Sequence, residues 1–191
     1  SQSNLPLRVG LLIDTSNSIR DRFKFEQEAA IEFLNQIIRP KEDRAFTLGF
    51  DTSPEITQEW TNSTEKLTSG IRMMRPGGGT AFYDAVYLAS RDKLLKELDK
   101  EKTTTPVRRA MIILSDGDDN QSRVTLSEAI EMAQRAEVIV YTISTNLAPN
   151  SDRGDRILKE LAEATGGRVF HPFKIEDVAD AFRDIQEELR S

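Results

Sequence analysis

The chain has 191 residues and a formal net charge of −6, with no cysteine and a single histidine. Its length fits one domain, or two very small ones. The absence of cysteine excludes disulfides, thiol nucleophiles and thiolate metal sites, and one histidine argues against a histidine-rich metal centre. An acidic chain with no long run of lysine and arginine is not expected to bind nucleic acid or an anionic membrane surface. No apolar run approaches the roughly 20 residues that span a bilayer, so direct membrane insertion is not expected.

Short apolar runs alternate with amphipathic stretches along the first half of the chain. The run before Asp14 predicts a buried strand, because strands covered on both faces read as unbroken apolar segments. Apolar residues spaced three and four apart predict helices instead. One apolar run follows so closely after Ser53-Pro54 that a hairpin and an antiparallel edge strand are expected. In chain order, this half should hold a strand at 8–13, a helix at 23–38, strands at 45–50 and 55–61, and a helix at 67–74.

The second half continues this alternation. A glycine-rich segment, Pro76-Gly77-Gly78-Gly79, precedes a long helix from Thr80 to about Leu95. Thr125 and Glu128 have the spacing of a capping box, which marks the start of another helix. The expected elements that follow the long helix are a strand at 110–114, a helix from 125, a strand at 138–143, a helix over 157–162, a last strand at 168–170 and a C-terminal helix over 178–189.

This order of elements predicts an α/β fold with a central, mostly parallel sheet and helices on both faces. No internal repeat is present, and no linker is long enough to divide the chain. We therefore expect one domain over residues 1–191. Because the chain starts with Ser1 rather than methionine, we expect it to be part of a longer protein.

Three loops bring the residue types of a metal site to one edge of the predicted sheet. Two apolar strands end at Asp14 and Asp116, and ligands of open parallel sheets bind beyond the carboxyl ends of the strands. Ser16 and Ser18 alternate with Asp14 in a tight turn, so their side chains can point the same way. Thr80 follows the glycine-rich loop, whose glycines allow the backbone to pass close to an ion.

Carboxylate and hydroxyl oxygens, without sulfur or imidazole, favour a hard divalent cation: Mg²⁺ first, then Mn²⁺ or Ca²⁺. Only two acids, Asp14 and Asp116, serve this site, and hydroxyls are weak neutral donors. An ion held with so little negative charge stays strongly electrophilic. It could therefore take a carboxylate from another molecule as its last ligand.

These residues resemble the metal-ion-dependent adhesion site of von Willebrand factor type A domains. The five positions that match, in order, are Asp14, Ser16 and Ser18, then Thr80 in a glycine-rich loop, then Asp116 before Gly117. The resemblance covers the chain from residue 7 to residue 189. The segments Gly-Gly-Gly-Thr-Ala-Phe-Tyr-Asp-Ala and Leu-Ser-Asp-Gly-Asp-Asp-Asn are similar to bacterial von Willebrand factor A-related domains.

The family implies a Rossmann-like α/β/α domain whose six-stranded sheet has one short antiparallel edge strand and about six flanking helices. It implies ligation by Ser16, Ser18 and Thr80, with Asp14 and Asp116 binding the ion directly or through water. It also implies a non-enzymatic interaction and adhesion module, in which the ion recruits an acidic residue of a partner protein. Related bacterial proteins are often exported, so an extracytoplasmic setting (secreted, periplasmic or cell-surface) is expected. The partner, the oligomeric state and any switching movement of the C-terminal helix are left open.

Two other classes of function are compatible with the same residues. An aspartate after the first strand beside Mg²⁺ also occurs in phosphoryl-transfer and hydrolytic enzymes. Against this alternative, Ser16 occupies the position at which the aspartate-phosphatase pattern has a second acid. A scaffold domain whose metal site is unused is the other alternative. Near the predicted site, Asp84 is interpreted as a residue that supports the ligands without binding the ion, with a merely exposed residue as the alternative. Asp118 and Asp119 are interpreted as a solvated acidic rim.

Overall fold

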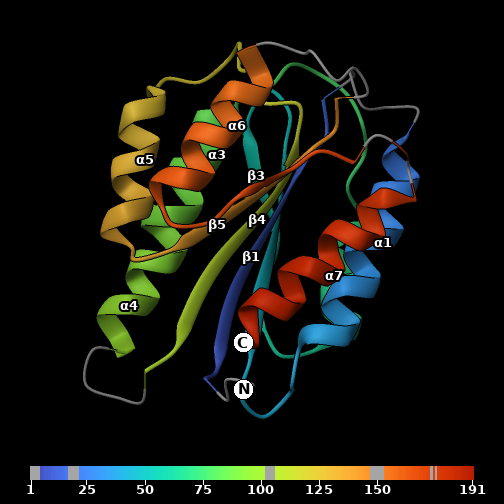
Figure 1. Cartoon of the computed structure of the whole chain (residues 1–191), viewed down its shortest axis with the longest axis vertical. Coiled ribbons are helices and arrows are strands. Elements are labelled where there is room, and N and C mark those ends of the chain that lie inside the picture. Colours follow the sequence, from blue (N-terminus) through green and yellow to red (C-terminus); the bar gives the residue numbers. More distant parts are fainter. Residues whose placement is uncertain (1–4, 17–21, 102–105, 147–152, 173, 175) are drawn as a thin grey trace.

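A computed structural model describes residues 5–16, 22–101, 106–146, 153–172, 174 and 176–191. Their strands form one six-stranded sheet in the order β3-β2-β1-β4-β5-β6 (Figure 1). The strands are β1 (Leu7–Asp14), β2 (Arg44–Phe50), β3 (Pro54–Thr61), β4 (Arg108–Ser115), β5 (Ile139–Ser144) and β6 (Val169–Phe170). Among these strands, β3 pairs antiparallel with β2 and the other pairings are parallel. The predicted sheet, including its antiparallel edge, is therefore confirmed.

The described helices form one layer on each face of the sheet, which confirms the three-layer α/β/α fold. One layer consists of α1 (Phe23–Ile37), α2 (Thr64–Arg72) and α7 (Asp177–Leu189). The other consists of α3 (Phe82–Leu88), the π-helical η2 (Ala89–Leu95), α4 (Lys96–Glu101), α5 (Leu126–Arg135) and α6 (Arg153–Ala164). In Figure 1, α1 and α7 lie to the right of the sheet and α3 to α6 to its left. No helix of the described residues has the length and apolar character to cross a membrane.

The central strands are apolar throughout because helices cover both of their faces. In β1, Leu11 and Ile13 belong to the core on the α1 side, whereas Leu12 belongs to the core on the α3 side. Gly10 leaves the space that the ring of Phe46 fills, since a Cβ at this position would lie 2.5 Å from Cζ of Phe46. Successive side chains of β1 thus contribute in turn to the cores on the two faces of the sheet.

The long helix that follows Thr80 differs from the prediction because a π-helix interrupts it. The segments α3, η2 and α4 follow one another without a break. The wider turns of a π-helix bury both Ala89 and Leu94, which are five residues apart, while Leu88 and Leu95 are only partly buried. A uniform helical period of 3.6 residues, which places Leu88 and Leu95 on the buried face, therefore does not describe this segment.

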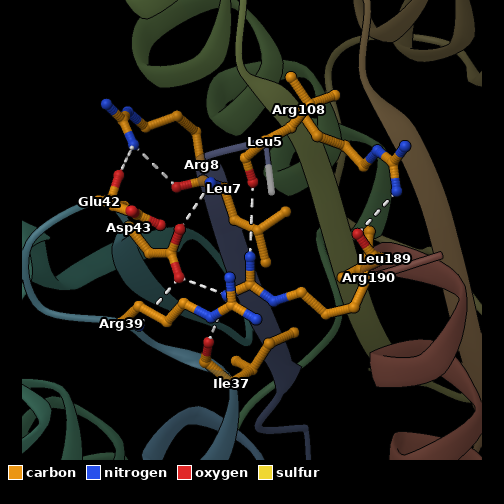
Figure 2. A network of polar contacts seen from close by, with 10 residues as sticks. All are labelled: Leu5, Leu7, Arg8, Ile37, Arg39, Glu42, Asp43, Arg108, Leu189 and Arg190. Carbon is orange, nitrogen blue, oxygen red and sulfur yellow. Dashed lines mark hydrogen bonds and ion pairs between the residues drawn. The ribbon is translucent and has the colours of Figure 1, made fainter. Parts of the chain in front are cut away.

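A buried ion pair closes the end of the molecule opposite the carboxyl edge of the sheet (Figure 2). The carboxylate of Asp43 is fully buried and accepts hydrogen bonds from the backbone N–H groups of Leu7 and Arg39, each at 2.8 Å. The guanidinium of Arg190, directly after α7, pairs with this carboxylate and donates to the carbonyl of Ile37 at 2.7 Å. The pair therefore joins the start of β1, the segment between α1 and β2, and the end of α7.

Candidate metal site

The two predicted aspartate ligands lie at the ends of adjacent parallel strands. Asp14 is the last residue of β1, and Asp116 directly follows β4. Ile13 faces Leu114 in the register of these two strands, so Asp14 is level with Ser115 and Asp116 lies one residue beyond it. Ser16 follows two residues after Asp14 on the same edge of the sheet.

Three of the five predicted ligands line one open hollow. The cavity has a volume of about 190 Å³ and is lined by Ser16, Gly78, Gly79, Thr80, Asp116, Asp118 and Asn120. Asp14 is fully buried and does not line the hollow, but it contacts the backbone of Ser16. Ser18, the fifth predicted ligand, lies outside the described residues.

Hydrogen bonds hold both oxygens of the Asp14 carboxylate. One oxygen accepts from the backbone N–H of Ser16 at 2.8 Å, and the other accepts from the hydroxyl of Ser115 at 2.9 Å. Burial, with a smaller contribution from the charge of Asp116, raises the pKa of Asp14 to about 6, although the hydrogen bonds from Ser16 and Ser115 lower it. A negative charge on Asp14 is therefore costly in the absence of a balancing cation.

The loop after β4 fixes the position of Thr80. The backbone N–H of Thr80 donates to Oδ1 of Asn120 at 2.9 Å, and its carbonyl accepts from the backbone N–H of Asn120 at 2.9 Å. Gly79 makes room for this contact, since a Cβ there would lie 2.9 Å from Oδ1 of Asn120. The sequence analysis did not identify Asn120 and Ser115 as residues that hold Thr80 and Asp14 in place. The one signal for them is that both lie close to Asp116 along the chain.

The structure corrects the interpretation of two neighbouring acids. Asp84 accepts hydrogen bonds from the backbone N–H groups of residues 123–124 at 3.0–3.1 Å and does not line the hollow. It holds the loop before α5 and is not a supporting residue of the site. Asp119 is half-buried and accepts from the backbone N–H of Tyr83 at 2.8 Å, so it anchors α3 and is not part of a solvated rim. Asp118 is exposed and lines the hollow.

The donor set around the hollow suits a hard divalent cation. Its candidate ligands are carboxylate and hydroxyl oxygens, which such ions prefer. The described residues contain no group of three or more His, Cys, Asp or Glu side chains that could hold a metal ion, so binding here would depend on the hydroxyls of Ser16 and Thr80. A cation would also offset the cost of charging the buried Asp14. The residues present therefore fit a divalent cation.

The fold and the hollow together define an α/β domain with a candidate cation site at the carboxyl edge of its sheet. The chain matches the family model of the von Willebrand factor type A domain over residues 9–188, and it belongs to that family. It is also 27% identical, over 175 residues, to the human von Willebrand factor A domain-containing protein 3B. That match covers 88% of this chain and 12% of the human protein, so the chain spans a small part of this relative.

Several solved structures share the fold. The von Willebrand factor type A structure from Catenulispora acidiphila matches with a TM-score of 0.75 and 16% identity, over 96% of this chain and 42% of that one. The vWF domain of the type V pili tip protein Mfa5 from Porphyromonas gingivalis matches with a TM-score of 0.69 and 15% identity, over 98% of this chain and 96% of that one. The D319A mutant of the PilB minor pilin from Streptococcus sanguinis matches with a TM-score of 0.73 and 14% identity, over 99% of this chain and 62% of that one. At these identities the likeness concerns the fold alone.

Proposed function

We propose that this domain is a metal-dependent protein-interaction module. A divalent cation, Mg²⁺ first and otherwise Mn²⁺ or Ca²⁺, would recruit an acidic residue of a partner protein. The proposed ligands are Asp14, Ser16, Ser18, Thr80 and Asp116. The observation that carries the proposal is the open hollow lined by Ser16, Thr80 and Asp116, next to the buried and hydrogen-bonded Asp14.

The residues of the chain have distinct parts in this proposal. The cation, when bound, supplies a Lewis-acidic coordination position for an outside carboxylate. Asp14 contributes a charge whose orientation is fixed by Ser16 and Ser115, and Asn120 holds the backbone of Thr80. Because the hydroxyl ligands are neutral, the two aspartates only just balance the charge of the ion. A carboxylate from a partner is therefore not repelled.

The family and the structural neighbours support a role in interaction and adhesion. These neighbours include a pilus tip protein, a minor pilin and an aerotolerance-related membrane protein from Bacteroides fragilis. By analogy we propose an extracytoplasmic setting, secreted, periplasmic or on a cell surface. We also propose that residues 1–191 form one domain, since a single sheet organises the described residues.

A metal-dependent phosphoryl-transfer or hydrolytic enzyme with Asp14 as nucleophile has less support. Both carboxylate oxygens of Asp14 accept hydrogen bonds, and the side chain is fully buried. Because no part of Asp14 is exposed, the structure offers a phosphorus or carbonyl centre no approach to either oxygen. The same arrangement is suited to a fixed ligand, whose role requires orientation and no movement.

Selection of peptides displayed on phage tests the proposed function. Binders selected against the domain in Mg²⁺ should each contain one indispensable Asp or Glu. Affinity should fall on the order of tenfold or more when that acid becomes Asn or Gln, when Mg²⁺ is chelated, or in Thr80→Ala. Thr80→Ala removes a hydroxyl and keeps both backbone hydrogen bonds to Asn120. Thr68→Ala on α2 serves as the matched control and should bind as the wild type does.

Two outcomes would contradict the proposed function. Peptides that tolerate both chelation and loss of the acid would favour a scaffold with an unused metal site. Turnover of phosphomonoesters or nucleotides in Mg²⁺ would favour the enzyme.

A further inference from the structure

A second cavity, called the side cavity below, adjoins the candidate metal site on the side of β2 and β3. Its volume is about 290 Å³, and its walls come from Thr15, the end of β2, the start of β3 and the residues that follow α2. Thr15 lines the side cavity, and its neighbour Ser16 lines the hollow of the candidate metal site. The walls of the two are therefore one residue apart along the chain.

The glycine-rich loop packs between the hollow and the side cavity. The backbone N–H of Gly77 donates to the carbonyl of Thr15 at 2.7 Å. Gly78 lines the hollow and Asp51 lines the side cavity, and a Cβ at Gly78 would lie 3.4 Å from Cβ of Asp51. The hollow and the side cavity are thus neighbouring parts of one surface at the carboxyl edge of the sheet.

The side cavity has room for a side chain because Gly49 leaves part of its lining open. A Cβ at Gly49 would come within 3.3 Å of Cγ of Met74 and 3.5 Å of Cγ2 of Thr15. Met73 also lines the side cavity. At 55% exposure it is one of two exposed large apolar side chains among the described residues. Its side chain offers apolar surface to the aliphatic stem of an occupant.

The charges that line the side cavity are mainly acidic. Asp51 is half-buried and Glu55 is exposed, and neither carboxylate forms an ion pair among the described residues. Arg75 lines the side cavity too, but its guanidinium donates to two backbone carbonyls at the end of α2, at 2.6 and 2.9 Å. Two carboxylates against one guanidinium leave one negative charge in excess, which favours a cationic occupant.

We propose that the side cavity receives a Lys or Arg side chain of the partner protein, close in sequence to the acid that binds the ion. This inference rests on the proposed function, because the acid at the ion brings the partner to this surface. The aliphatic stem of the basic residue packs on Met73, and its cationic end pairs with Asp51 or Glu55. An apolar side chain would remove both carboxylates from water without giving them a partner.

The spacing of the acid and the base follows from the closeness of the two cavities. An extended segment covers roughly 10 Å in three residues. Because the walls of the hollow and the side cavity are one residue apart at Thr15 and Ser16, we expect the basic residue within about three residues of the acid. The partner is therefore recognised by a charge pair in one short segment.

Selection from a library of random peptides on phage, each with one fixed Asp, tests the inference in Mg²⁺. Peptides selected on the wild type should be enriched in Lys or Arg within about three residues of the fixed Asp. Asp51→Asn/Glu55→Gln should lose this enrichment and bind a basic wild-type binder roughly tenfold more weakly. It should keep the wild-type dissociation constant for Mn²⁺, because neither acid lines the hollow.

Two further variants exclude a general effect on the fold. Glu59→Gln is the matched control, since Glu59 lies exposed on the same strand, pairs with Lys93 and does not line the side cavity. It should select the same basic peptides as the wild type. Glu55→Lys reverses the charge at the side cavity and should select a second Asp or Glu in place of the basic residue. A damaged domain cannot produce that gain.

The outcomes separate this inference from the proposed function. If the selected peptides need the fixed Asp and Mg²⁺ but show no enrichment of Lys or Arg, or an enrichment of apolar residues instead, the inference is wrong and the proposed function stands. Equal enrichment of basic residues on the wild type and on Asp51→Asn/Glu55→Gln also overturns the inference. Binding that survives both chelation and replacement of the fixed Asp by Asn overturns the proposed function, and the inference with it.

Discussion

Replacing Asp43 by alanine is expected to lower the free energy of unfolding by about 3–5 kcal/mol, the cost of leaving a buried charge without its partner. The change strips the guanidinium of Arg190, which is 8% exposed, of its counter-ion. It also leaves the backbone N–H groups of Leu7 and Arg39 without their acceptor. Folded domains are typically stable by only about 5–15 kcal/mol, so Asp43→Ala should remove a large part of the stability.

Urea denaturation of Asp43→Ala and two comparison variants measures this effect. Asp92→Ala breaks an exposed ion pair with Arg91 and should change stability by less than about 1 kcal/mol. The double variant Asp43→Ala/Arg190→Met should be more stable than Asp43→Ala alone, because no buried charge is left unpaired. If Asp43→Ala loses no more stability than Asp92→Ala does, the buried ion pair between Asp43 and Arg190 does not have the stabilising role given to it here.

Gly117→Ala is expected to damage the fold and the metal site together. Gly117 has φ +82°, and a Cβ at this position would lie 2.1 Å from the carbonyl oxygen of Gly154. The left-handed conformation alone costs an L-residue roughly 1–2 kcal/mol, and the clash forces the backbone to move as well. The loss of stability should therefore exceed that range. Because Asp116 is the preceding residue, the affinity for a divalent cation should fall too.

Two other glycines separate the conformational cost from the clash. Gly166 has φ +87° and nothing within 4 Å of an added Cβ, so Gly166→Ala carries the conformational cost alone. Gly77→Ala carries neither penalty, since its added Cβ also has nothing within 4 Å. In thermal unfolding, Gly117→Ala should lose the most stability, Gly166→Ala less and Gly77→Ala the least. Equal losses for Gly117→Ala and Gly166→Ala would show that the contact with Gly154 costs nothing.

The sheet could be predicted from the sequence because its signals are local. Strands buried on both faces appear as unbroken apolar runs. β1 ends at Asp14, and β4 ends one residue before Asp116. The π-helical segment could not be predicted in this way. Its extra residue per turn is stabilised by packing of Ala89 and Leu94 against the rest of the core, and a helical period read from the sequence alone contains no information on that packing.

Part of the candidate site could likewise be predicted, because its residue types and loop positions are visible in the sequence. The structure brings Ser16, Thr80 and Asp116 to one hollow, whereas Ser18 remains a prediction outside the described residues. Asn120 could not be recognised in the sequence, for a physical reason. Asn120 acts through a hydrogen bond between loops forty residues apart.

Binding of a divalent cation by the wild type and by Asp116→Asn tests the central claim most directly. The melting temperature is measured in chelator and then with Mg²⁺, Mn²⁺ or Ca²⁺ added. An ion at 100 times its dissociation constant adds about 2.7 kcal/mol if it binds only the folded state, which corresponds to a rise of roughly 5–10 °C for a chain of this size. We predict this rise for the wild type and its loss in Asp116→Asn, which keeps the shape of the side chain and removes its charge. No rise with any of the three ions, or the same rise in both proteins, would contradict a metal site at Asp116.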